Sequence, residues 1–156
     1  MTIKAGQHAP CRWPALQWQM QVIRYDVMFT DSCRYDIGKE DQGDINKLFG
    51  IGYWPHHHKN SVRFGWNYLK GDDINLYAYW YSKGQRAYKY LGYVKIGMRH
   101  TFVILPSANY HNLAVQGRGI AYTVPVPGQR FGYALGPYFG GNKLAPHDIH
   151  ILMDKL

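Results

Sequence analysis

The feature that most constrains the fold is a strict two-residue alternation along residues 61–68, SVRFGWNY. Large apolar or aromatic side chains alternate there with small or polar ones, which are Ser61, Arg63, Gly65 and Asn67. Successive side chains of a β-strand point to opposite faces of its sheet. The segment therefore predicts a strand with one face in a hydrophobic core and a second, polar face that carries an arginine.

Similar strand-like segments recur along the chain and are separated by turn signals. They cover residues 19–30, 45–53, 74–81, 86–94, 101–105, 131–139 and 148–153, and residues 114–126 are predicted as a strand pair or a strand with a loose turn. The 14 Tyr and 5 Trp favour pleated surfaces, and the 17 Gly favour turns. Little helix is expected. We therefore predict an all-β fold, a single jelly-roll β-sandwich of two antiparallel sheets.

The length of 156 residues predicts one domain with its own core. Residues 1–20, which include two prolines, are predicted as an N-terminal arm or edge strand, and residues 21–156 as the jelly-roll domain. A disulfide between Cys11 and Cys33 is compatible with the sequence but not required by it. The oligomeric state stays open.

The N-terminus has no apolar signal core, and no apolar run reaches transmembrane length. This indicates a cytoplasmic or particle-associated protein without a membrane partner. The protein would be secreted if a signal segment precedes the printed sequence.

Charge is distributed very unevenly along the chain. No Asp or Glu occurs between Ile74 and His147, a stretch that holds eight Lys or Arg, whereas the remaining residues hold ten basic and ten acidic side chains. Such a stretch attracts anions. It also lacks the pair of carboxylates that most glycoside hydrolases use. The charge pattern therefore favours an anionic ligand and argues against an ordinary glycosidase.

Two segments resemble a known family. Residues 25–81 contain NKLFGIG, SVRFGW and INLYAYWY, and residues 137–151 read PYFGGNKLAPHDIHI. Together they resemble the concanavalin A-like jelly roll of alginate-lyase-type polysaccharide lyases, which carry K-L-P-G-L-like, S-x-R-x-x-W-like and Y-A-Y-like strands and an F-G-G-rich turn. The second segment is also similar to small uncharacterised bacterial proteins that end in PYFGG…APHDI. Phe49 stands where the lyases have a proline, and this chain is shorter than they are.

The resemblance implies four candidate catalytic residues. Lys47 matches a lyase lysine, Arg63 the arginine of the S-x-R strand, and Tyr77 and Tyr79 the Y-A-Y tyrosines. A β-elimination needs a cation beside the uronate carboxylate, a base and an acid, and these side chains can supply all three. Each also has an ordinary structural interpretation, because strand arginines form ion pairs and tyrosines two residues apart pack on neighbouring strands. Whether the protein is an enzyme stays open, and a non-enzymatic binder is favoured.

Further side chains are candidates for ligand contact. Aromatic platforms and polar rim residues are predicted at Trp54, Trp80, Tyr81, Tyr138, His58 and Asn60. His56, His57 and His58 are consecutive, so their imidazoles diverge on an extended backbone and do not predict a metal site. No cofactor-binding fingerprint is present, so no cofactor is expected.

The leading functional prediction is a carbohydrate-recognition jelly roll that binds a glycan, expected to be anionic, on its concave face, with lyase-type activity left open. The alternative is a non-enzymatic binder or sequestering protein for a nucleotide, a nucleic acid or a protein partner, of the phage- or defence-related kind. A sequence pI near 9.5 and the many aromatic residues fit both.

Overall fold

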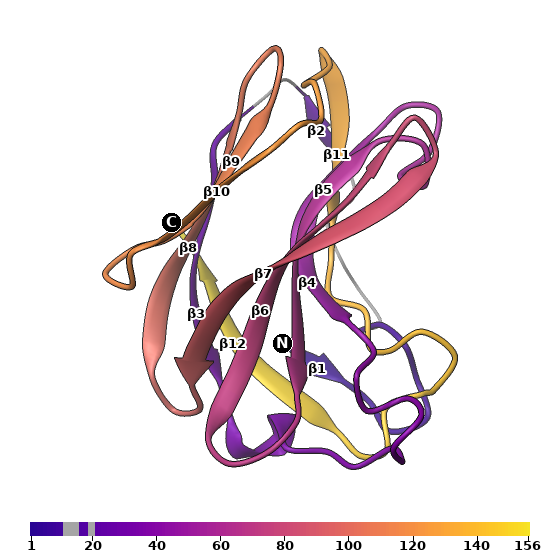
Figure 1. Ribbon diagram of the computed structural model, residues 1–156, viewed down its shortest axis with the longest axis vertical. Helices are drawn as coiled ribbons and strands as arrows, with labels where there is room; N and C mark the ends of the chain where they lie inside the picture. Colours follow the sequence, from indigo (N-terminus) through magenta and orange to yellow (C-terminus); the bar gives the residue numbers. More distant parts are fainter. Residues whose placement is uncertain (11–15, 19–20) are drawn as a thin grey trace.

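Two six-stranded antiparallel sheets pack face to face (Figure 1). The computed structural model describes residues 1–10, 16–18 and 21–156. Within those ranges the helical structure is a single 3₁₀ turn, η1 (Asp31–Cys33). The all-β, jelly-roll prediction is therefore confirmed. Cys33 is a buried free cysteine, and Cys11, the partner that the sequence would allow for it, lies outside the described residues.

One sheet, called here the β3 sheet, has the strand order β1-β12-β3-β8-β9-β10. Its strands are β1 (Thr2–Ile3), β12 (Ile149–Lys155), β3 (Ile23–Phe29), β8 (Arg99–Pro106), β9 (His111–Val115) and β10 (Ile120–Val124). The other, called the β5 sheet, has the order β2-β11-β4-β5-β6-β7. Its strands are β2 (Leu16–Trp18), β11 (Phe131–Leu135), β4 (Asn46–Tyr53), β5 (Ser61–Tyr68), β6 (Asp73–Ser82) and β7 (Gln85–Lys95).

Most predicted strands occur close to their predicted bounds, and one segment differs. The segment 114–126 holds the end of β9, a turn and β10, which pairs with β9, in keeping with the prediction of two strands or a strand with a loose turn. The predicted strand 131–139 ends at Leu135, because Gly136 and Pro137 follow and proline cannot donate to a sheet ladder. Residues 136–148 are a loop instead, and this loop carries Tyr138.

The core lies between the sheets and is rich in aromatic rings. Val62, Phe64 and Trp66 of β5 are completely buried, as the alternation predicted. The ring of Phe64 lies 5.1 Å from that of Phe102 on β8, and Trp66 lies 5.3 Å from Phe29 on β3. Each such side chain contributes about 1.5–3 kcal/mol through burial.

The opposite face of β5, called here the groove face, is also shielded from solvent. Ser61, Arg63 and Asn67 are at most 8% exposed. This is unusual, because an antiparallel sheet commonly leaves one face in water. Glycine makes the close packing possible: a Cβ on Gly50 would lie 2.1 Å from the Val62 carbonyl oxygen and 2.6 Å from Arg63 Cγ.

The N-terminal strands lie at sheet edges, β1 beside β12 and β2 beside β11. Asp148 ties this end to the last strand, because its carboxylate pairs with Lys4 at 2.7 Å and accepts the Ala5 backbone N–H at 2.9 Å. In the part of the chain that is described, no helix has the length and apolar character needed to cross a membrane.

Candidate functional site

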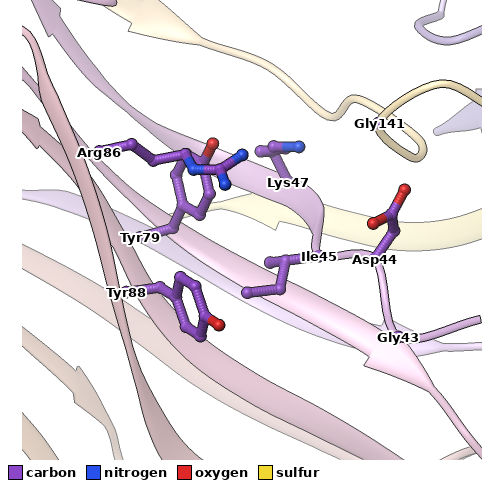
Figure 2. A pocket seen from close by; sticks show the side chains of 8 residues that line it. All are labelled: Gly43, Asp44, Ile45, Lys47, Tyr79, Arg86, Tyr88 and Gly141. Carbon is purple, nitrogen blue, oxygen red and sulfur yellow. The ribbon is translucent and has the colours of Figure 1, made fainter. Parts of the chain in front are cut away.

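A groove of about 320 Å³ crosses the groove face. Its walls come from β4, β5, β6, the loop after β4 and the loop 136–148, with Lys47, His57, His58, Arg63, Tyr79 and Tyr138 among the lining residues. A smaller compartment of about 160 Å³ adjoins it and is lined by Asp44, Arg86 and Tyr88. Lys47, Tyr79 and Gly141 line both, so the two spaces form one continuous site. Figure 2 shows the smaller compartment.

Strand register aligns the groove side chains in rows. Arg63 on β5 is directly opposite Tyr79 on β6, which is opposite Tyr88 on β7. The next row is Ser61, Tyr81 and Arg86. Directly opposed residues of antiparallel strands share a face, so these rows bring basic and aromatic side chains together.

The loop 136–148 closes the groove through backbone contacts with β4. Lys47 and Tyr138 exchange two backbone hydrogen bonds, of 2.8 and 2.9 Å. The Gly140 N–H donates to the Asn46 side-chain oxygen. Gly140 has φ of 71°, and a Cβ there would lie 2.4 Å from the Lys143 carbonyl oxygen, so the turn requires glycine.

The Lys47 side chain extends from β4 toward the glycine turn of the loop 136–148. Its Nζ donates to the Gly140 carbonyl at 3.2 Å and lies 5.1 Å from the centroid of the Tyr79 ring and 5.6 Å from that of Tyr138. Burial lowers the Lys47 pKa to about 8, and the positive charge of Arg63 acts in the same direction. The ammonium therefore loses its proton within a range of pH that is close to physiological.

Arg63 forms the floor of the groove. Its Nη2 donates to the Gly136 carbonyl, whereas its buried Nε has no hydrogen-bond partner among the described residues. Burial lowers the Arg63 pKa to about 10, and the groups that counteract this shift are tyrosines rather than carboxylates. Burying a cation without an acidic partner costs folding free energy.

The positive charges of the site are those of Lys47, Arg63 and Arg86, and the carboxylate of Asp44 in the smaller compartment acts to raise the Lys47 pKa. Burial lowers the His57 pKa to about 4, with smaller contributions from the neighbouring His58 and Arg63, so His57 is neutral at neutral pH. Burial raises the Tyr79 pKa to about 12, which keeps its hydroxyl protonated. The main compartment therefore offers cations and O–H donors.

The structure brings six of the predicted site residues into the groove, and they are Lys47, His58, Arg63, Tyr79, Tyr81 and Tyr138. Tyr77 shares their face but lies one row away, where its hydroxyl donates to Asn67 at 3.4 Å and its ring contacts Tyr90. Asn60 accepts a hydrogen bond from the Lys83 backbone N–H at 3.0 Å and so holds the turn between β6 and β7.

The two predicted tryptophans lie elsewhere. Trp80 alternates with Tyr79 and Tyr81, so it points to the core side, where it lies opposite Val62 and contacts the ring of Tyr122. Trp54 is 76% exposed and lines a separate surface hollow. The structure therefore places neither Trp54 nor Trp80 in this groove, and contact of either with a ligand stays a prediction.

Sequence reasoning missed several groove residues. Arg86 and Tyr88 could have been found, because the two-residue turn Lys83–Gly84 fixes the register of β7 on β6 and places them opposite Tyr81 and Tyr79. Ser61 could also have been found, because it lies two residues before Arg63 and therefore on the same strand face. Nothing in the local sequence predicts that Asp44 or His57 lines this site.

No group of three or more His, Cys, Asp or Glu side chains within the described ranges is arranged to hold a metal ion. The neutral His57 and the nearby His58 instead border the main compartment as polar wall residues.

The sequence matches no protein-family model and no curated protein. Among solved structures, an alginate lyase from Alteromonas sp. 272 is similar, with 11% identity, a TM-score of 0.47 and coverage of 80% of this chain. This chain spans about half of that lyase, 55% of its length. A polysaccharide lyase of family 18 matches with 8% identity and a TM-score of 0.48 over 92% of this chain and 76% of the other. A homodimeric agglutinin from chicken liver matches with 8% identity and a TM-score of 0.44 over 97% and 98% of the two chains.

Proposed function

We propose that this protein binds a saccharide that carries carboxylate groups, with a carboxylate held between Lys47 and Arg63. One observation carries the proposal: Arg63 is buried and Lys47 is half-buried, and neither forms an ion pair within the described ranges of the chain. A buried charge is costly unless it is paired. A ligand carboxylate would provide the missing partner.

The tyrosines of the groove support a sugar rather than a small inorganic anion. Tyr79, Tyr81 and Tyr138 line the main compartment, and Tyr88 lines the smaller one. A tyrosine offers an apolar ring and a polar hydroxyl, which suits a sugar ring with its apolar face and its hydroxyl groups. Two adjoining compartments also suit an oligosaccharide better than a single ring.

Lyase-type cleavage is a second candidate, which the properties of Lys47 favour. A proton-transfer group works best when its pKa lies near the working pH, and the Lys47 pKa is about 8. Arg63 would neutralise the uronate carboxylate, and Tyr79 is a protonated hydroxyl on the same wall. These are the group types that β-elimination requires.

A nucleotide or nucleic acid is the competing ligand class, favoured by the edge strand β7. Tyr88 and Tyr90 are 57% and 50% exposed there, with Lys89 between them and Arg86 two residues before Tyr88. Bases stack on such rings, and binding that neutralises phosphates weakens steeply with salt. The salt dependence of oligonucleotide binding therefore separates this class from a glycan.

The test is calorimetric titration of the protein with an oligouronate and with the same oligosaccharide after reduction of its carboxyl groups. We expect binding of the charged form alone, and loss of that binding in Arg63→Met. Arg99→Met, on the outer face of the β3 sheet, serves as the matched control and keeps binding. Equal affinity for both oligosaccharides, or salt-sensitive binding of an oligonucleotide alone, would contradict the proposal. Absorbance of unsaturated uronate products decides whether binding leads to cleavage.

A further inference from the structure

The N-terminal segment runs along the loop that supplies Tyr138 to the groove. The Gly6 N–H donates to the Ala145 carbonyl at 2.8 Å, and the Ala145 N–H donates to the Gln7 carbonyl at 3.1 Å. The Phe139 N–H donates to the His8 carbonyl at 2.6 Å. Residues 6–8 thus hold both ends of the glycine turn in the loop 136–148.

The His8 side chain reaches further and contacts Tyr138 itself. The two rings are parallel, with an interplanar angle of 3° and centroids 4.8 Å apart. His8 Nδ1 lies 2.9 Å from the Phe139 carbonyl oxygen, which can only accept, so this nitrogen carries the proton and donates. One hydrogen bond therefore orients the imidazole, and the oriented imidazole covers the Tyr138 ring.

Tyr138 is contacted from the groove as well, because Lys47 Nζ lies 5.6 Å from its ring centroid. A tyrosine beside a half-buried ammonium has to keep one orientation if both are to contact the same ligand. Two backbone hydrogen bonds to Lys47 hold the Tyr138 backbone, but they do not fix the rotation of its side chain.

We infer that His8 is a positioning residue for the binding site: its imidazole, oriented by the Phe139 carbonyl, fixes the ring of Tyr138 in the groove wall. The N-terminal segment is then part of the site, although more than a hundred residues separate it from Tyr138 in sequence. A test of this inference by ligand affinity rests on the proposed function, whereas a test by the ring resonances of Tyr138 does not.

Three substitutions of His8 distinguish the contribution of its ring from that of its hydrogen bond. His8→Phe keeps the stacked ring, His8→Asn keeps a side-chain donor, and His8→Ala removes both. We expect the dissociation constant for an oligouronate to rise by about twofold to tenfold in His8→Ala, as for loss of an aromatic pair. His8→Phe restores most of that affinity, and His8→Asn does not. His147→Ala is the matched control, because His147 bonds the Ser32 carbonyl away from the groove.

A second readout needs no ligand. The Tyr138 ring resonances, assigned by comparison with Tyr138→Phe, should shift in His8→Ala and in His8→Asn as the ring current of the imidazole is lost, and should shift less in His8→Phe. Unchanged Tyr138 resonances in His8→Ala would overturn the inference, and so would equal affinity of all three variants for a ligand that the native protein binds. If the native protein binds no oligouronate, the proposed function fails, and the resonances alone decide the role of His8.

Discussion

The groove and the outward face of the β3 sheet both carry basic side chains, but in different surroundings. On the β3 sheet, Arg99 pairs with Asp154 across the face, and the Thr101 hydroxyl donates to Asp26. On the β5 sheet, Lys47 and Arg63 lie among tyrosines without an acid in ion-pair range among the described residues. The fold itself therefore does not require buried cations, and the groove face bears a free-energy cost that its counterpart avoids.

The largest expected effect comes from removing the groove cation. Arg63→Met should raise the dissociation constant for an oligouronate at least about thirtyfold, as for truncation of a buried charged contact. The same variant should keep or raise the melting temperature, because an apolar side chain replaces a buried charge that forms no ion pair within the described part of the chain. Titration calorimetry and thermal unfolding measure the two changes.

The outcome that would erase the difference between the faces is a strongly destabilised Arg63→Met that still binds the oligouronate. Arg63 would then hold the fold together, and the groove face would resemble the β3 sheet. Arg63→Lys tests the geometry further, because lysine keeps the charge but lacks the planar guanidinium.

The next effect concerns the packing of the groove floor. Gly50→Ala should lower the free energy of unfolding by about 1–3 kcal/mol, because the new methyl group collides with the backbone of β5. Gly43→Ala is the matched control: a Cβ there meets nothing within 4 Å, so the change should stay within about 0.5 kcal/mol. Chemical denaturation measures both. Equal stability of the two variants would mean that the groove floor is not closely packed.

A smaller effect follows from the titration of Lys47, whose pKa is lowered to about 8. As pH rises from 7 to 9 the ammonium loses its proton, so affinity for an anionic ligand should fall by up to about tenfold. Lys47→Arg should remove this pH dependence, because arginine stays charged. Lys95 provides the contrast, since its contact with Asp73 raises its pKa. If the affinity of the native protein for the anionic ligand stays the same between pH 7 and 9, Lys47 does not contact that ligand.

The smallest effect is expected on the face that carries paired charges. Asp154→Asn should lower the free energy of unfolding by less than about 1 kcal/mol, because Arg99 and Asp154 form an exposed ion pair that salt screens. Oligouronate affinity should not change. A loss of binding in Asp154→Asn would show that the two faces are not independent.

Much of the fold could be predicted from local sequence. The alternation along residues 61–68 assigned Phe64 and Trp66 to the core and Arg63 to the opposite face, and the structure agrees. The same rule, applied consistently, excludes Trp80 from the groove, because Trp80 lies between Tyr79 and Tyr81. Local reasoning could also reach Arg86, one short hairpin away.

The sequence by itself determined which side chains share a strand face, where the basic stretch lies and that the chain forms β-sheets. The tertiary structure alone decided that Tyr138 lies beside Lys47, that His8 covers Tyr138 and that Arg63 has no acidic partner among the residues that the structure describes. The reason is physical: strand faces follow from a backbone repeat of two residues, whereas pairing between distant segments depends on packing the whole chain at once.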